Sequence, residues 1–207
     1  MNLQETHLET LHEIRDLMNK SSRFISLSGL AGVSAGIFAL LGAAIAFWYL
    51  GLSFYEPNNY EAIRNEKEFL LFFFADATGV LLASIVASIY FTTRKAKRKG
   101  LPIWDTTAKR MLINLFLPLI AGGLFCITLV LHNVLPLVAP ATLIFYGLGL
   151  LNASKYTLND LRYLAICEII LGILAAFWSG YGLLFWAIGF GILHILYGWL
   201  MYHKYEN

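Results

Sequence analysis

The sequence predicts an all-α fold, an integral membrane bundle of six transmembrane helices with both termini on the cytoplasmic side. Apolar residues make up 58% of the 207 residues and charged residues only 14%, whereas an ordinary soluble domain has about 25% charged residues. The apolar residues gather into six long runs, and Lys and Arg fall almost entirely on one side of them. A chain this short has too little interior to bury so much apolar surface in water, which excludes a soluble or disordered protein.

Residues 1–23 are predicted to form a cytoplasmic amphipathic helix ahead of the first span. Asn2 is a suitable N-cap, and Leu3, Leu8 and Leu11 recur at nearly helical spacing. The segment has a net charge of −1, so strong attraction to anionic lipid is not expected. Two interpretations stay open: an interfacial helix that lies against its own bundle, or a docking surface for a cytoplasmic protein or a second copy of the chain.

Residues 24–203 are predicted to form the six-helix transmembrane domain. A span needs about 20 apolar residues, because the hydrocarbon core is about 30 Å thick and a helix rises 1.5 Å per residue. The runs are continuous rather than alternating in polarity, which excludes a β-barrel. The first run also begins too late and is too long for a secretory signal. The predicted spans are residues 24–50, 69–92, 108–132, 135–153, 161–179 and 183–202.

The positive charges orient the predicted bundle. Thirteen of the 15 Lys and Arg residues fall on the side that holds the N-terminus, and the other two, Arg64 and Lys67, fall in the 51–68 loop. Cytoplasmic loops carry the excess of positive charge, so both termini and the cluster Arg94 to Lys99 are expected in the cytoplasm. In a bacterial cell the location would be the cytoplasmic (inner) membrane. Between two spans this basic cluster is a topology signal, so lipid rather than nucleic acid is the expected partner.

Four ionisable side chains fall within or at the ends of the spans and are the candidate site residues. A charged Asp, Lys or Arg at the centre of a spanning helix costs at least about 2.5–3.5 kcal/mol, so each such group needs a partner or a wet cavity. The four candidates are Asp76, Glu168, His194 and His132.

Glu168 and His194 are predicted to lie at the same depth. The fifth and sixth spans are joined by a short turn around Tyr181, and the two residues lie thirteen positions before and after it. Adjacent antiparallel helices bring such residues level, and the two can hydrogen-bond if both face the interior. Such a pair can relay a proton. A purely structural bond between two helices and a metal site are the alternatives.

Asp76 and the first span give two further expectations. Asp76 lies about two turns below the outer boundary, and His132 is the nearest candidate partner in depth. In the first span, Ser28, Gly32 and Gly36 repeat at four-residue spacing. This small-residue face predicts close approach by a neighbouring helix.

The buried polar residues favour a protein that moves or senses a small solute or ion, that is, a transport function. The alternative is a non-transporting membrane scaffold or regulator that docks a cytoplasmic partner through the N-terminal helix. A homo-oligomer is also compatible with the sequence.

An enzyme is the less favoured class, and no catalytic residue, metal site or cofactor is predicted. No nucleophile, base and oxyanion donors converge, and no metal or nucleotide signature is present. Residues 32–36 spell G-x-S-x-G, but a nucleophile elbow needs a strand-to-helix turn and this motif lies inside a continuous apolar run.

Overall fold

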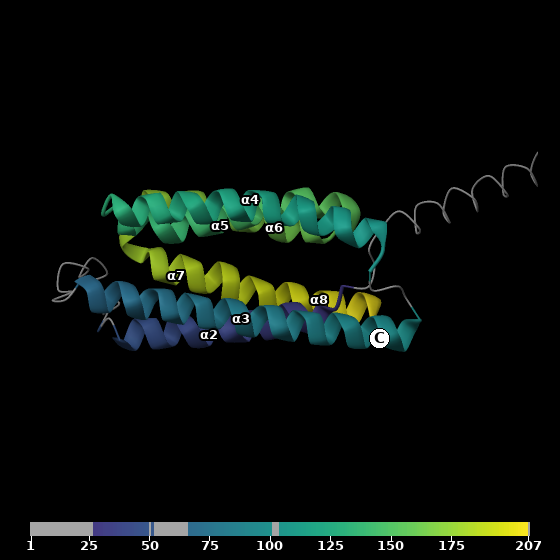
Figure 1. Cartoon of the computed structure of the whole chain (residues 1–207). Helices are drawn as coiled ribbons and strands as arrows, with labels where there is room; N and C mark the ends of the chain where they lie inside the picture. The colour runs from purple at the N-terminus through teal and green to yellow at the C-terminus, as the bar shows by residue number, and fades with distance from the viewer. Residues whose placement is uncertain (1–26, 50, 52–65, 101–103, 207) are drawn as a thin grey trace, which may run out of the picture.

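The computed structural model describes residues 27–49, 51, 66–100 and 104–206. All regular secondary structure in these residues is helical, so the all-α part of the predicted fold class is confirmed for this part of the chain (Figure 1). The predicted helix of residues 1–23 lies outside the described residues. The long helices are α2 (Gly29–Tyr49), α3 (Glu66–Lys99), α4 (Thr106–Leu131), α5 (Val138–Ala153), α6 (Leu161–Phe177) and α8 (His194–Tyr205).

Shorter segments complete the chain between these helices. Three 3₁₀ turns lie in the connections, η2 (Leu135–Leu137), η3 (Ser154–Tyr156) and η4 (Ser179–Tyr181). The helix α7 (Gly182–Trp186) leads into a π-helix, η5 (Ala187–Leu193), which continues directly into α8. The predicted sixth span is therefore three consecutive helical segments rather than one uniform α-helix.

Five of the helical stretches are long and apolar enough to cross a membrane, which indicates a multi-pass membrane protein. They are Gly29–Tyr49, Glu68–Lys99, Thr106–Leu131, Leu135–Tyr156 and Ser179–Tyr205. The remaining helix, α6, has 17 residues and is about 25 Å long at 1.5 Å per residue, the lower end of the range for a spanning helix.

Helix α3 runs further than the predicted span 69–92, because it continues through the basic cluster to Lys99. Charged residues with long side chains are good helix formers, so the apolar run ends before the helix does. The helix stops at Gly100, whose φ of +63° is the left-handed conformation typical of the residue after a helix. The basic side chains at the C-terminus of α3 therefore lie at one end of the bundle. We call this end the basic end.

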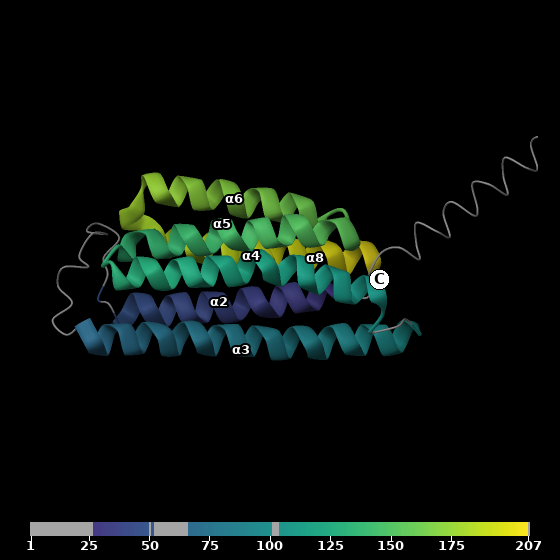
Figure 2. The same cartoon turned by 45° about the horizontal axis from the view of Figure 1, so that its top comes forward.

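The helices form two layers. Helices α4, α5 and α6 make one layer, with α5 packed between the other two, and α2, α3 and α8 make the second, with α2 packed between α3 and α8 (Figures 1 and 2). The segment of α7 and η5 contacts α5 and α6 on one side and α2 on the other, so it joins the layers.

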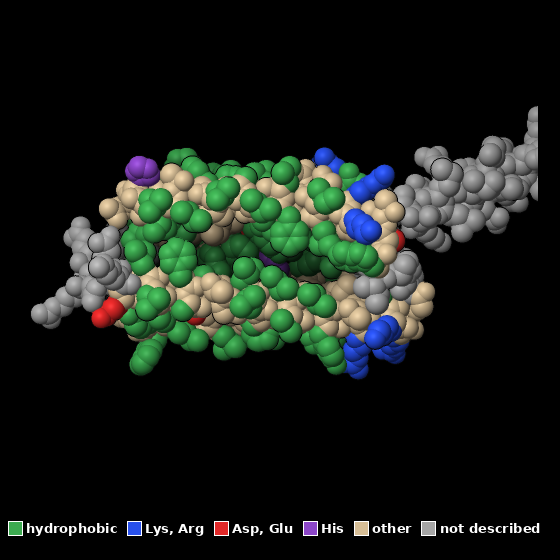
Figure 3. All heavy atoms as spheres, in the orientation of Figure 1, with side chains coloured by type: hydrophobic (Ala, Val, Ile, Leu, Met, Phe, Trp, Pro, Cys, Tyr) green, Lys and Arg blue, Asp and Glu red, His purple; other side chains and the backbone are tan. Residues whose placement is uncertain are grey.

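A hollow separates α4 from α3 on one side of the molecule, and we call it the lateral groove (Figures 1 and 3). Its walls are mainly hydrophobic, and a histidine side chain is visible on its floor (Figure 3). The helices run lengthwise along the hollow, so the groove faces sideways, toward the hydrocarbon of a membrane.

Glycines allow α2 to pack closely, in an antiparallel direction, against the continuous segment of η5 and α8. A Cβ added to Gly32 would lie 3.1 Å from Cα of Gly198, and one added to Gly36 would lie 2.6 Å from the carbonyl oxygen of Gly191. A Cβ on Gly198 would lie 2.5 Å from the carbonyl oxygen of Gly29. The small-residue face predicted in the first span therefore meets a matching face on the last helical segment.

Gly198→Ala is expected to lower the unfolding free energy in detergent by about 1–3 kcal/mol, the usual cost of overpacking, because the new methyl group would meet backbone that cannot rotate away. Gly123→Ala is the matched control: a Cβ there meets nothing within 4 Å, so the variant should be neutral or more stable. Equal stability of the two variants in a thermal or denaturant titration would contradict the backbone contact between α2 and α8.

Candidate functional site

The structure brings two of the four predicted site residues together and leaves the other two apart. Glu168 in α6 and His194 at the start of α8 are both buried, at the junction of α5, α6 and η5. Asp76 lies on α3 in the other layer, and His132 caps the C-terminal end of α4. The candidate site is therefore built around Glu168 and His194.

Glu168 is fully buried, with a relative exposure of 0%. Its carboxylate reaches the backbone of η5: a Cβ added to Gly189 would lie 2.5 Å from Oε2 of Glu168. A larger residue at this position would require the carboxylate of Glu168 or the side chain of Leu143 to shift. Neither carboxylate oxygen has a hydrogen-bond partner among the described residues, which is unusual for a buried polar group.

His194 uses both ring nitrogens. Its Nδ1 lies 3.0 Å from the carbonyl oxygen of Gly189, and its Nε2 lies 2.7 Å from the hydroxyl of Tyr146. A carbonyl oxygen can only accept, so Nδ1 carries the hydrogen and donates it to Gly189. In the neutral ring Nε2 then accepts from Tyr146. The Gly189 carbonyl, which cannot donate, therefore fixes this tautomer.

The contact between Glu168 and His194 differs from the expected hydrogen bond. Oε1 of Glu168 lies 3.4 Å from Nδ1 of His194, within ion-pair distance, but the N–H of Nδ1 has its shorter contact with Gly189. The two residues do lie level, as their equal distance from the turn predicts. The π-helix η5, whose i→i+5 bonds give a wider turn, precedes His194 and places the Gly189 carbonyl beside its ring.

Aromatic rings surround His194 on one side. The ring of Phe190 stacks on His194 with centroids 5.9 Å apart, and Tyr146 lies 4.8 Å from Phe190. Trp186 extends the cluster, with its ring 5.0 Å from Phe190. These three aromatic residues are half-buried. We call Glu168, His194 and Tyr146 the polar node.

The hydroxyl of Tyr197 is a further polar group near this depth, one turn of α8 beyond His194. It is buried and has no hydrogen-bond partner among the residues that the structure describes. Tyr197 and Tyr146 both pack against the same apolar cluster, which includes Leu150 and Leu164. The polar node therefore has a polar neighbour on its side toward the basic end.

Asp76 and His132, the candidate partner nearest to it in depth, do not form a pair. A Cβ added to Gly42 would lie 3.4 Å from the carboxylate of Asp76, which therefore packs against α2. His132 is exposed at the C-terminal end of α4, in the opposite layer, and the two make no hydrogen bond. Depth alone suggested the pairing, and the layer arrangement separates the two residues. Among the described residues, no group of three or more His, Cys, Asp or Glu could hold a metal ion.

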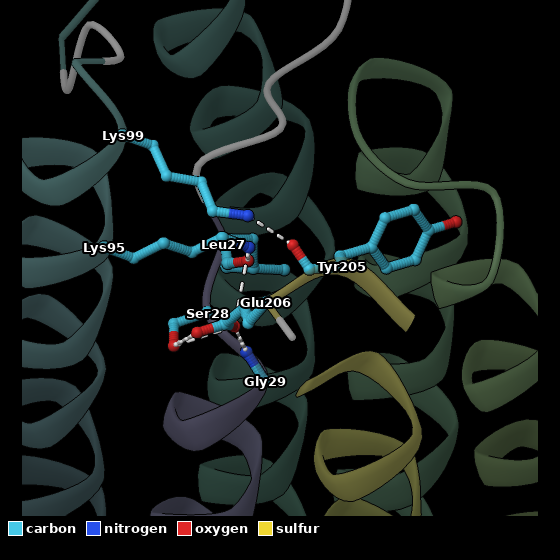
Figure 4. Close-up of polar contacts among 7 residues, drawn as sticks. All are labelled: Leu27, Ser28, Gly29, Lys95, Lys99, Tyr205 and Glu206. Atoms are coloured by element: carbon cyan, nitrogen blue, oxygen red, sulfur yellow. Dashed lines mark hydrogen bonds and ion pairs between the residues drawn. The ribbon is translucent and has the colours of Figure 1, made fainter. Parts of the chain in front are cut away.

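A second polar cluster lies at the basic end, where Glu206 caps the start of α2 (Figure 4). Oε1 of Glu206 accepts from the backbone N–H of Gly29 at 2.6 Å and from the hydroxyl of Ser28 at 3.1 Å. Nζ of Lys95 lies 3.4 Å from the same oxygen and donates to the carbonyl of Leu27 at 2.6 Å. This cluster joins α2, α3 and the residue that follows α8.

The end of α8 also reaches the other layer. Lys204 and the hydroxyl of Tyr205 both donate to Oδ2 of Asp160, at 2.9 and 2.7 Å, and Asp160 precedes α6. Burial raises the pKa of Asp160, but these two hydrogen bonds outweigh it and hold the pKa below its ordinary value. Residues 204–206 thus connect both layers at the basic end.

Sequence reasoning missed Tyr146, Gly189 and Glu206. Tyr146 lies in a strongly apolar helix, where a lone tyrosine is usually a packing residue. Gly189 contributes a backbone carbonyl and leaves space because it has no side chain. A residue pattern reveals neither property. Glu206 is a polar residue near a charged terminus, and the only signal was its position just beyond the last span.

Comparisons of the chain with protein-family models, with curated proteins and with solved structures find no match. The functional argument therefore depends on the geometry of the polar node and of the membrane-spanning helices.

Glu168→Gln and His194→Ala are expected to lower the unfolding free energy non-additively. The double variant should lose less than the sum of the single losses by about 0.5–3 kcal/mol, because residues in contact are energetically coupled. Denaturant unfolding in micelles measures all three variants. Thr128→Ala, on the exposed face of α4, combined with Glu168→Gln is the distant control and should be additive within about 0.5 kcal/mol. Additivity in both pairs would contradict the contact.

Glu206→Ala is expected to destabilise the folded state by about 2–4 kcal/mol, because it leaves Lys95 buried without its counter-charge and removes the cap of α2. Thermal unfolding in detergent measures the loss. Lys97→Met is the control. It changes an exposed lysine on α3, the helix that carries Lys95, and should shift stability by less than about 0.5 kcal/mol. An unchanged melting temperature for Glu206→Ala would contradict the capping role.

Proposed function

We propose that this chain is a multi-pass membrane protein that moves or senses a small ion, and that the ion is a proton handled by the polar node. The observation that carries this proposal is the burial of Glu168 and its lack of hydrogen bonds among the described residues. Its carboxylate is fully buried, both oxygens lack hydrogen-bond partners among the described residues, and His194 lies 3.4 Å away. A carboxylate retained in such a place is costly for stability, which favours a functional role.

The tautomer of His194 supports a direction for the proton. Because Nδ1 already donates to Gly189, an added proton binds at Nε2, on the side of Tyr146. The hydroxyl of Tyr146 then turns so that its oxygen accepts from the ring. Glu168, beside Nδ1, balances the positive charge of the imidazolium, since an opposite charge within about 4 Å stabilises the charged ring. The node is electrically neutral with this proton and negative without it.

The groups beyond Tyr146 support an exit toward the basic end. The buried hydroxyl of Tyr197 follows His194 by three residues on α8, and Tyr205, hydrogen-bonded to Asp160, lies two turns further. These hydroxyl and carboxyl groups provide donors and acceptors along one side of α8. Asp76 takes no part, because it packs against α2 in the other layer.

We further propose six crossings with the basic end in the cytoplasm. The antiparallel contact of α2 with α8 fits an even number of crossings, which would place the two termini on one side. The excess of Lys and Arg at the same end supports a cytoplasmic location for it. This arrangement would make the 51–68 loop external and would direct the proposed proton path from the polar node toward the cytoplasm.

One observation favours the alternative, a non-transporting scaffold or regulator. Asp76 and Glu168 lie at separate helix contacts rather than in one shared cavity. This is expected if the buried acids only stabilise the packing of neighbouring helices. The N-terminal segment that would dock a cytoplasmic partner lies outside the described residues. The two functions differ in whether protons cross a membrane that contains the protein alone.

Proteoliposomes with an internal pH-sensitive dye test the proposal. The purified full chain should dissipate an imposed pH gradient, and Glu168→Gln and His194→Gln should each lower the rate at least about tenfold, the effect typical of removing a proton-transfer group. Tyr146→Phe, which keeps the ring but loses the hydroxyl, should lower the rate less.

Asp76→Asn is the matched control, because it removes a membrane-depth carboxylate outside the polar node and should leave the rate unchanged. A wild-type rate at the background of empty liposomes from pH 5 to pH 8 would contradict proton movement and favour the scaffold. Equal loss in Asp76→Asn and Glu168→Gln would show that the polar node is not the site.

A further inference from the structure

Two sets of positive charges lie at the basic end, on the two helices that border the lateral groove. Arg94, Lys97 and Arg98 are exposed at the end of α3, and Lys109 and Arg110 are exposed near the start of α4. Figure 3 shows Lys and Arg gathered at this end of the molecule, above and below the level of the hollow. The two helices that border the groove therefore both carry cations at the basic end.

None of these five cations has an ion-pair partner among the described residues. The acids near them are already engaged: Glu206 pairs with Lys95, Asp160 pairs with Lys204, and Asp105 accepts from the backbone N–H of Ala108. Counting only the described residues, the basic end has positive charge without a counter-ion, and an external anionic group would complement it.

The groove itself cannot stay empty in a bilayer. Its walls are mainly hydrophobic and it faces sideways, so hydrocarbon rather than water fills it, since a void would forfeit dispersion contacts along its whole lining. His194 lies 11 residues before the end of α8 at Tyr205, about 16 Å at 1.5 Å per residue. That length along the helix is about half of the hydrocarbon thickness of about 30 Å, comparable with the reach of one leaflet's acyl chain.

We propose that the lateral groove binds an anionic phospholipid, with an acyl chain along the hydrophobic walls toward His194 and the headgroup phosphate between the cations of α3 and α4. The aromatic rings around His194 give the chain end a firm contact: Tyr146 and Phe190 both touch the histidine ring and are half-buried. This binding does not depend on proton movement, and either proposal can fail alone.

Native mass spectrometry of the full chain in detergent tests the headgroup part. Phosphatidylglycerol should bind at least about fivefold more tightly than phosphatidylcholine with the same chains, because each basic residue near an anionic headgroup contributes about 1 kcal/mol. The double variant Arg94→Gln and Arg98→Gln should remove this preference. Lys155→Gln with Arg162→Gln, which changes two exposed cations on the α5 and α6 side of the same end, should leave it within twofold.

A photoreactive acyl chain tests the groove part. Phosphatidylglycerol with a diazirine near the chain end should label peptides that contain Tyr146 or Phe190 at least fivefold more than the peptide with Ile170 and Ile173, which are exposed on α6. Equal affinity for the two lipids, equal loss in both double variants, or labelling spread evenly over α6 would overturn the proposal. Displacement of the lipid by millimolar glycerol phosphate would show a headgroup site alone and would overturn the role of the groove.

Discussion

Close contact between helix backbones is the constraint on which the rest of this structure depends. In a bilayer, apolar side chains gain little by leaving lipid for one another, so helices associate where their backbones can approach. Glycine allows this at three of the helix contacts: Gly198 against α2, Gly147 against α6, and Gly149 against α4. The exposed faces of α3 and α4 carry large apolar side chains instead, and those faces meet lipid.

The same constraint creates the polar node. Gly189 brings the backbone of η5 so close to α6 that the Glu168 carboxylate fits against it, and it also supplies the carbonyl that fixes the tautomer of His194. A side chain at position 189 would remove the space for Glu168 and displace the segment that carries His194. The chemistry proposed for the node is thus a consequence of tight packing, and no separate binding pocket is required to explain it.

The sequence predicts the apolar helices well because the cost of burying charge in lipid limits where an apolar run can begin and end, although a helix such as α3 can continue beyond its run. It also predicts that Glu168 and His194 lie level, because a short turn fixes the register of two antiparallel helices. It does not identify the partner of Asp76, since depth is readable from a sequence but the layer to which a helix belongs is not. Gly189 and Tyr146 were missed for a related reason: one acts through a backbone carbonyl, and the other through a partner from a helix not adjacent in sequence.

The two ends of the described bundle differ in how the layers are joined. At the basic end, residues 204–206 connect Asp160 of one layer to the start of α2 in the other, which fixes the separation of the layers there. Further along, the contact between layers passes through α7 and η5, and the lateral groove borders that segment. Any change in the shape of η5 on protonation of His194 would therefore alter the floor of the groove. The contacts of residues 204–206 would still hold the two layers together at the basic end. The polar node and the lateral groove therefore meet at one structural element, η5, which belongs to the contact between the layers.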